Sequence, residues 1–132
     1  MPRTPGQRAG DEAEAIVADR LAAAGWTILG RNVRVGRAEI DLLALDPGPP
    51  AALVVVEVRR RGRRDFGLAE ETVNHRKRTR LWAAGCALVE AGQAPDGTRI
   101  PRHPIRIDLV AVEPGPGATG PRIRHHRWLG RR

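Results

Sequence analysis

The chain has one cysteine, no tyrosine and one phenylalanine among 132 residues, and these shortages exclude several kinds of protein. A single cysteine forms no disulfide within the chain, which excludes the disulfide scaffolds of small secreted domains. Because Cys86 lies in a helical apolar pattern, we expect a buried structural thiol and a reducing compartment. Three tryptophans and one phenylalanine are too few for a surface on which nucleic-acid bases stack.

Long apolar runs are also missing. No uninterrupted apolar stretch approaches the ~20 residues that a membrane-spanning helix requires, and no apolar leader precedes a cleavage-like site. We therefore expect no membrane partner and a cytoplasmic location. The length is sufficient for one domain that folds around its own core without a disulfide or a structural metal.

Negative charge is scarce relative to positive charge. Acidic residues number 15 against 23 basic ones, which gives a net charge of +8, and Lys77 is the only lysine. Basic side chains placed over phosphates release condensed counterions, so an excess of this size favours a polyanionic partner. We expect this partner to be a nucleic acid, most simply DNA. Phosphate contacts carry no sequence information, which suits recognition of a DNA shape such as a branch.

The apolar periodicity predicts two helices and five strands. We expect a flexible basic tail over residues 1–8 and a single domain over residues 9–130. Helical spacing marks residues 9–24 and 69–91, and strand patterns mark 26–35, 38–46, 52–61, 105–112 and, as a candidate edge strand, 122–129. The order αβββαββ predicts an α/β fold, with a mixed central sheet of about five strands flanked by helices.

Two acids lie where acids are costly, in runs expected to be buried strands. Asp41 and Glu57 project to one face if their strands are neighbours, and Mg²⁺ typically takes one or two carboxylates plus waters and phosphate oxygens. Mg²⁺ or Mn²⁺ is thus the expected cofactor, and the backbone carbonyl of Val58 is a further candidate ligand. The alternative is that both acids only pair with nearby arginines such as Arg59 and Arg37.

Several segments in order carry a resemblance to known proteins. They are AEAIVADRLAAAGWTILGRNVRV, AEIDLLALD, VVVEVRRR, FG, KRTRLWAAG and IRIDLVAV. Together these resemble the YraN family of endonuclease-like proteins, and more distantly the PD-(D/E)xK nuclease superfamily that includes archaeal Holliday-junction resolvases. The resemblance implies a restriction-endonuclease-like fold and a metal-dependent DNA endonuclease that hydrolyses phosphodiester bonds, on branched DNA, in repair or recombination. Junction-cutting enzymes of this fold need two active sites, so a homodimer would fit.

The resemblance also assigns roles to individual residues. It makes Asp41 and Glu57 the metal ligands, while Glu14 of the first helix reaches the metal directly or through water. Glu39 matches an acid of the E-I-D triplet, and it either assists at the site or orients a basic neighbour.

One departure from the family pattern affects the expected chemistry. The residue two after Glu57 is a lysine in the family and is Arg59 here. Arginine neutralises charge in a transition state, but it stays protonated and does not activate water as a lysine does. The site therefore either hydrolyses with electrostatic help from Arg59, or binds nucleic acid without cutting it. A basic structural protein of a ribonucleoprotein is a third alternative.

One cluster of basic residues follows Glu57, and another opens the second helix. Lys77 is the only other candidate for the motif lysine, and the alternative is that it contacts phosphate or solvent. Alternation sends Arg60 to the opposite face from Arg59. The expected nucleic-acid-binding residues are Arg61, Arg63, Arg64, Arg76, Lys77 and Arg80.

Overall fold

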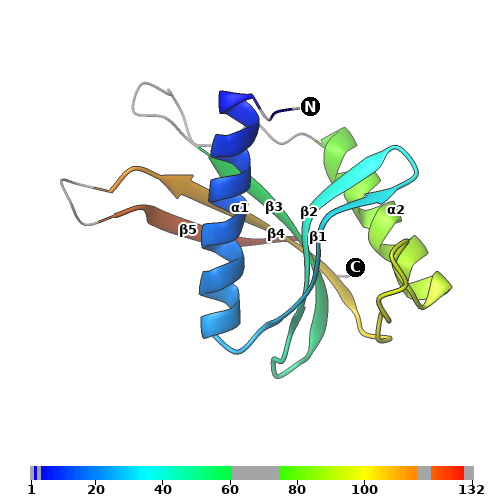
Figure 1. Ribbon diagram of the computed structural model, residues 1–132. Coiled ribbons are helices and arrows are strands. Elements are labelled where there is room, and N and C mark those ends of the chain that lie inside the picture. The colour runs from blue at the N-terminus through cyan, green and yellow to red at the C-terminus, as the bar shows by residue number, and fades with distance from the viewer. Residues whose placement is uncertain (1, 3, 61–74, 116–119, 130–132) are drawn as a thin grey trace.

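The chain folds into a five-stranded sheet with one helix on each face (Figure 1). The computed structural model describes residues 2, 4–60, 75–115 and 120–129, and the backbone alone at 128 and 129. The elements are α1 (Pro5–Ala23), β1 (Thr27–Val35), β2 (Ala38–Asp46), β3 (Ala52–Arg60), α2 (His75–Ala91), β4 (Ile105–Glu113) and β5 (Arg122–Leu129). The predicted α/β class, the mixed sheet and the order αβββαββ are confirmed.

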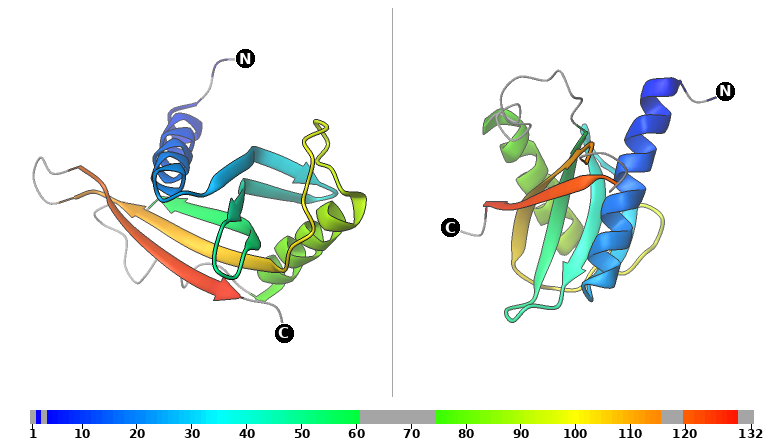
Figure 2. Two further views of the ribbon diagram at one scale, coloured as in Figure 1. Left: turned by 90° about the horizontal axis from the view of Figure 1, so that it is seen from below. Right: turned by 90° about the vertical axis from the view of Figure 1, so that its left-hand side faces the viewer.

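The sheet order follows the chain order, β1-β2-β3-β4-β5. β3 and β4 run parallel because α2 lies in the connection between them, and the other neighbouring pairs are antiparallel. Figure 2 shows α1 and α2 on opposite sides of the sheet. β3 is therefore covered on both faces, which explains its uninterrupted β-branched run.

Each helix covers its own apolar cluster. On the α2 side, Leu81 and Leu88 pack with Val55 and Ile107, and all four are at most 3 % exposed. On the α1 side, Val17 and Leu21 pack with strand residues that include Val54, Val56 and Val110. Alternate residues of β3 thus enter different clusters, and the same alternation decides which polar side chains share a face.

Two predictions about the helices are wrong. α1 begins at Pro5 rather than Ala9, so residues 5–8 form its first turn instead of a flexible tail. The cause is a capping box: the Thr4 hydroxyl accepts a hydrogen bond from the Gln7 N–H at 3.1 Å, and the Thr4 N–H donates to Gln7 Oε1 at 2.8 Å. Cys86 is exposed rather than buried, because the buried stripe of α2 passes through Gly85, one position before it.

A polar network on the α1 side attaches β5 to β4. Asp108 is fully buried, and Arg106 and His125 Nε2 bind its carboxylate at 2.7–2.9 Å. Arg106 also donates to Asp46 Oδ2 at 2.9 Å, and its guanidinium lies 5.5 Å from the ring centre of Trp26. Burial by itself would raise the pKa of Asp108, but the hydrogen bonds from His125 and Arg106 outweigh burial and lower it. The network fixes which face of β5 looks toward α1.

Candidate functional site

The candidate site forms where β2 and β3 separate. The last paired residues of the two strands are Leu42 and Val56, and continuing this register by one position sets Asp41 opposite Glu57. Beyond this pair, the Asp41 side chain takes the place of a backbone acceptor: its Oδ2 accepts a hydrogen bond from the Val58 N–H at 2.9 Å. Facing residues of antiparallel strands project to the same face, so the two predicted acids lie side by side.

Glu57 is the most enclosed of the predicted site residues, with a side chain that is 3 % exposed. Its Oε1 lies 2.7 Å from Lys77 Nζ and 3.5 Å from Arg59 Nη2. Its Oε2 is buried and has no hydrogen-bond partner among the described residues. A buried carboxylate oxygen without a partner is costly, and a bound cation would remove this cost.

The electrostatics of Asp41 reflect this crowding of acids. Burial, followed by the charge of Glu57, raises the pKa of Asp41 to about 7. The hydrogen bond from the Val58 N–H lowers it by less, and the more distant charges of Glu14 and Lys77 contribute with opposite signs. Two neighbouring carboxyl groups are costly to ionise at the same time, and a cation bound between them would reduce this cost.

Glu14 of α1 lies close enough to Asp41 for its charge to raise the pKa of that carboxyl. Its side chain is buried, and its Oε1 has no hydrogen-bond partner in the described part of the chain and lies 3.9 Å from Arg31 Nη2. Burial raises the pKa of Glu14, and the charge of Arg31 offsets this only in part. Arg31 also donates to the Asp11 carbonyl at 3.2 Å, so it links β1 to α1 beside Glu14.

The donor set suits a divalent cation that prefers oxygen ligands. Within residues 4–60, 75–115 and 120–129, no three His, Cys, Asp or Glu side chains gather closely enough to hold a metal ion by themselves. Mg²⁺ does not require such a group, since it is usually bound by one or two carboxylates and keeps several waters. Asp41 and Glu57 are the two carboxylates that could hold such an ion.

Lys77 is the residue whose importance the sequence understates. It lies in the first turn of α2, and the fold brings its ammonium to Glu57 across 20 positions of sequence. The sequence signals for Lys77 are that it is the single lysine among 23 basic residues and that it opens the segment KRTRLWAAG. A lysine is therefore present at the second carboxylate, and it is supplied by the helix, whereas the strand supplies Arg59.

The remaining predicted residues lie at different distances from the two acids or outside the described residues. Arg59 lies on the Glu57 face, and Arg76 and Arg80 are exposed near the start of α2. Glu39 is half exposed and pairs with Arg34 at 3.0 Å, which agrees with the alternative that it orients a basic neighbour. Arg61, Arg63 and Arg64 lie outside the described residues.

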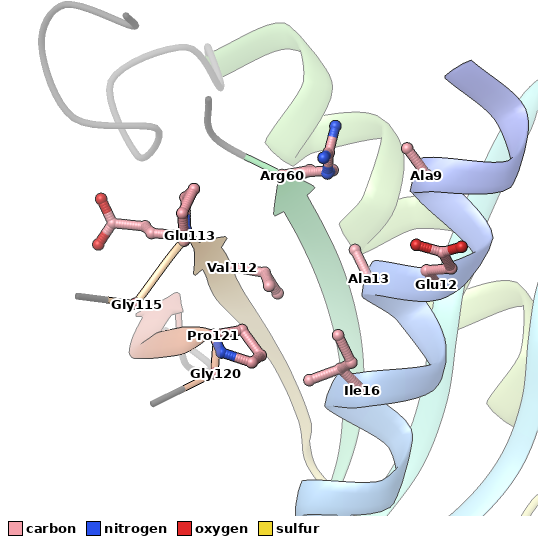
Figure 3. Close-up of a pocket in the computed structure, with 11 residues that line it drawn as sticks. Ala9, Glu12, Ala13, Ile16, Arg60, Val112, Glu113, Gly115, Gly120 and Pro121 are labelled. Atoms are coloured by element: carbon pink, nitrogen blue, oxygen red, sulfur yellow. The ribbon is translucent and has the colours of Figure 1, made fainter. Parts of the chain in front are cut away.

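Arg60 lies on the α1 side, as alternation predicts. Figure 3 shows it beside a cavity of about 340 Å³ between α1 and the ends of β4 and β5, where Glu12, Ile16 and Val112 also lie. This cavity is on the opposite face of the sheet from Asp41 and Glu57, so it is separate from the carboxylate pair.

Comparisons with known proteins give a consistent result. The profile described as "Uncharacterised protein family UPF0102" matches residues 13–112, which include Asp41, Glu57 and Lys77. The chain is 40% identical over 118 residues to a UPF0102 protein of Roseiflexus castenholzii, covering 89% of each chain. It is 37% identical over 121 residues to one of Pseudomonas savastanoi pv. phaseolicola, covering 92% of each. Neither described helix is long and apolar enough to cross a membrane.

Proposed function

The chain belongs to the UPF0102 family, and we propose that it is a metal-dependent nuclease of the PD-(D/E)xK type that hydrolyses phosphodiester bonds in DNA. The YraN resemblance is confirmed at the level of the family. The superfamily, the activity, the cofactor and the DNA partner are parts of the proposal, and the cytoplasmic location and the homodimer stay predictions.

One observation carries the proposal: Glu57 is buried beside Asp41, one of its oxygens lies 2.7 Å from Lys77 Nζ, and the other has no hydrogen-bond partner among the residues that the structure describes. An acid that only stabilised the fold would have both oxygens satisfied by neighbouring donors. Here the free oxygen and the crowded partner acid make a cation favourable, and the lysine provides a second positive charge beside it.

Asp41 and Glu57 would hold Mg²⁺, with Glu14 acting directly or through water. The ion supplies an acidified water and stabilises charge on the phosphoryl group. The Val58 N–H fixes the rotamer of Asp41, and the Glu57 carboxylate fixes Lys77. From this position the Lys77 ammonium would orient the attacking water by donating a hydrogen bond to it. Arg59, on the same face, neutralises charge on the phosphate.

The second candidate function is a module that binds nucleic acid without cutting it. The observation in its favour is that Lys77 already neutralises Glu57 Oε1 at 2.7 Å, which reduces the need for a metal ion. The two functions differ in whether divalent ions and Glu57 are required.

Cleavage of end-labelled branched and linear DNA in Mg²⁺ or Mn²⁺ separates them. We expect the wild type to cut and Glu57→Gln to lose more than about 100-fold in rate, since even outer partners of a metal site are worth 10- to 100-fold. Glu90→Gln, which removes an exposed acid of α2, is the matched control and should cut normally. Binding without cutting by the wild type, by Glu57→Gln and by Arg59→Lys would refute the nuclease and leave the binding module.

A further inference from the structure

β1 meets α1 through two consecutive polar side chains that the expected site does not include. Arg31 Nη2 lies 3.9 Å from Glu14 Oε1 and donates a hydrogen bond to the Asp11 carbonyl at 3.2 Å. Burial raises the pKa of Glu14, and after the charge of Arg31, hydrogen bonding from the Asn32 side chain lowers it. Both β1 residues are exposed, so neither contributes to the apolar core.

A β-bulge puts Arg31 on the α1 side of the sheet. Ile28 packs into the α1-side cluster, and in a regular strand the residue three positions later would face the other way. The register with β2 shifts between Ile28 and Gly30, which leaves Leu29 as an extra residue. Arg31 therefore pairs with Leu42, which also faces α1, and its guanidinium reaches the helix.

The backbone of Asn32 departs further from a regular strand. Among the described residues, it is the only one other than glycine with a positive φ, which is 51°. This left-handed conformation is unfavourable for residues with a Cβ, and Asn tolerates it better than most of them. Neighbours in a regular strand point to opposite faces, whereas Arg31 and Asn32 both act on Glu14. Strained residues of this kind cluster at functional sites, where the surrounding contacts hold them.

Glu14 is a carboxylate that needs to be held in one orientation. Its charge acts on Asp41, and its long side chain must be fixed by neighbours if the carboxylate is to serve a metal centre. We propose that Asn32 is a positioning residue that holds the Glu14 carboxylate toward Asp41. Arg31 ties the same turn of α1 to β1 through the Asp11 carbonyl. The inference rests on the proposed function and adds the residue that orients its helix carboxylate.

The alternative is that Asn32 only shapes the bend of β1. Glycine would fill that role at least as well, because it adopts a positive φ without strain. Asn32→Gly therefore keeps the backbone of β1 and removes only the side chain that reaches Glu14. In urea denaturation with chelator, we expect this variant to be at least as stable as the wild type.

The test is binding of Mn²⁺, followed by the electron paramagnetic resonance signal of the free ion, to the wild type, Asn32→Gly, Glu14→Gln and the double variant. We expect Asn32→Gly to weaken Mn²⁺ binding about 10-fold, as the loss of an outer partner does at metal sites. In the Glu14→Gln background the same change should have no further effect, because Asn32 acts through Glu14. Thr27→Gly, which removes another exposed side chain of β1, is the matched control and should bind like the wild type.

Failures of the two proposals are distinguishable. Wild-type Mn²⁺ affinity in Asn32→Gly, or an equal loss of affinity with and without Glu14, would overturn the positioning role and leave the metal centre. Absence of Mn²⁺ binding by the wild type would overturn the metal centre and the positioning role together.

Discussion

Replacing Asp41 by Asn should stabilise the metal-free protein above neutral pH. Burial, followed by the charge of Glu57, raises the pKa of Asp41 from 3.8 to about 7. A carboxyl whose folded pKa lies above its unfolded value gives stability that is fully present below the unfolded pKa and is lost as the pH rises through the folded pKa. The wild type therefore loses stability between about pH 4 and pH 7, and an amide at this position does not.

The expected change in the free energy of unfolding follows from the difference between the two pKa values. From 3.8 to about 7, at ~1.4 kcal/mol for each tenfold change in proton affinity, the full effect is about 4 kcal/mol. Asp41 is only partly buried, and Asn keeps an oxygen that accepts the Val58 N–H. We therefore expect Asp41→Asn to raise the free energy of unfolding by about 2 kcal/mol at about pH 8, and by little at about pH 4.

Urea denaturation of the wild type and Asp41→Asn in chelator, at several values from about pH 4 to about pH 8, measures this difference. Asp19→Asn, at an exposed position of α1, is the matched control and should show no such trend. Adding Mg²⁺ should stabilise the wild type and not Asp41→Asn, because an ion that binds only the folded state adds its binding energy. A difference that does not change with pH, or an Asn variant less stable at about pH 8, would refute the electrostatic account of the site.

Two further predictions concern the fold. Asp108→Ala should lower the free energy of unfolding by about 3–5 kcal/mol near neutral pH, because it leaves Arg106 and His125 without their buried partner. The pKa of Asp108 is lowered in the fold, so this difference, measured by urea denaturation, should shrink as the pH falls below about 4. A difference that persists at lower pH would contradict this account. Thr4→Ala should cost about 1 kcal/mol through loss of the α1 cap, with less helical circular dichroism, whereas unchanged stability would show that the first turn contributes little.

Strand positions could be predicted closely because local pattern determines them. β2 and β5 have the bounds that their alternation predicts, and β1 differs by one residue. Helix ends and faces were predicted less well. The proline and glycine of PRTPGQR suggested a tail, but the Thr4 and Gln7 side chains cap a helix at this point. A shift of one position around α2 separates buried Gly85 from exposed Cys86, a difference too small for an approximate periodicity to resolve.

The candidate site was predictable where it depends on strand register and not where it depends on helix docking. Neighbouring strands are enough to predict that Asp41 and Glu57 share a face, and in the structure both acids lie one position beyond the last β2–β3 pair, Leu42 and Val56. The contact between Lys77 and Glu57 depends on how α2 packs on the sheet, which no local pattern encodes. The partner of Asp41, the Val58 N–H, likewise follows from the separation of two strands rather than from the sequence alone.

Binding of Mn²⁺ to the protein, followed by the electron paramagnetic resonance signal of the free ion, tests the central claim most directly because it needs no substrate. The wild type and Glu90→Gln should bind the ion, and Glu57→Gln should lose this binding, since the buried Oε2 of Glu57 and the carboxylate of Asp41 would hold the metal. Equal binding by Glu57→Gln and the wild type, or no binding by either, would contradict the proposal that Asp41 and Glu57 form the metal centre of a nuclease.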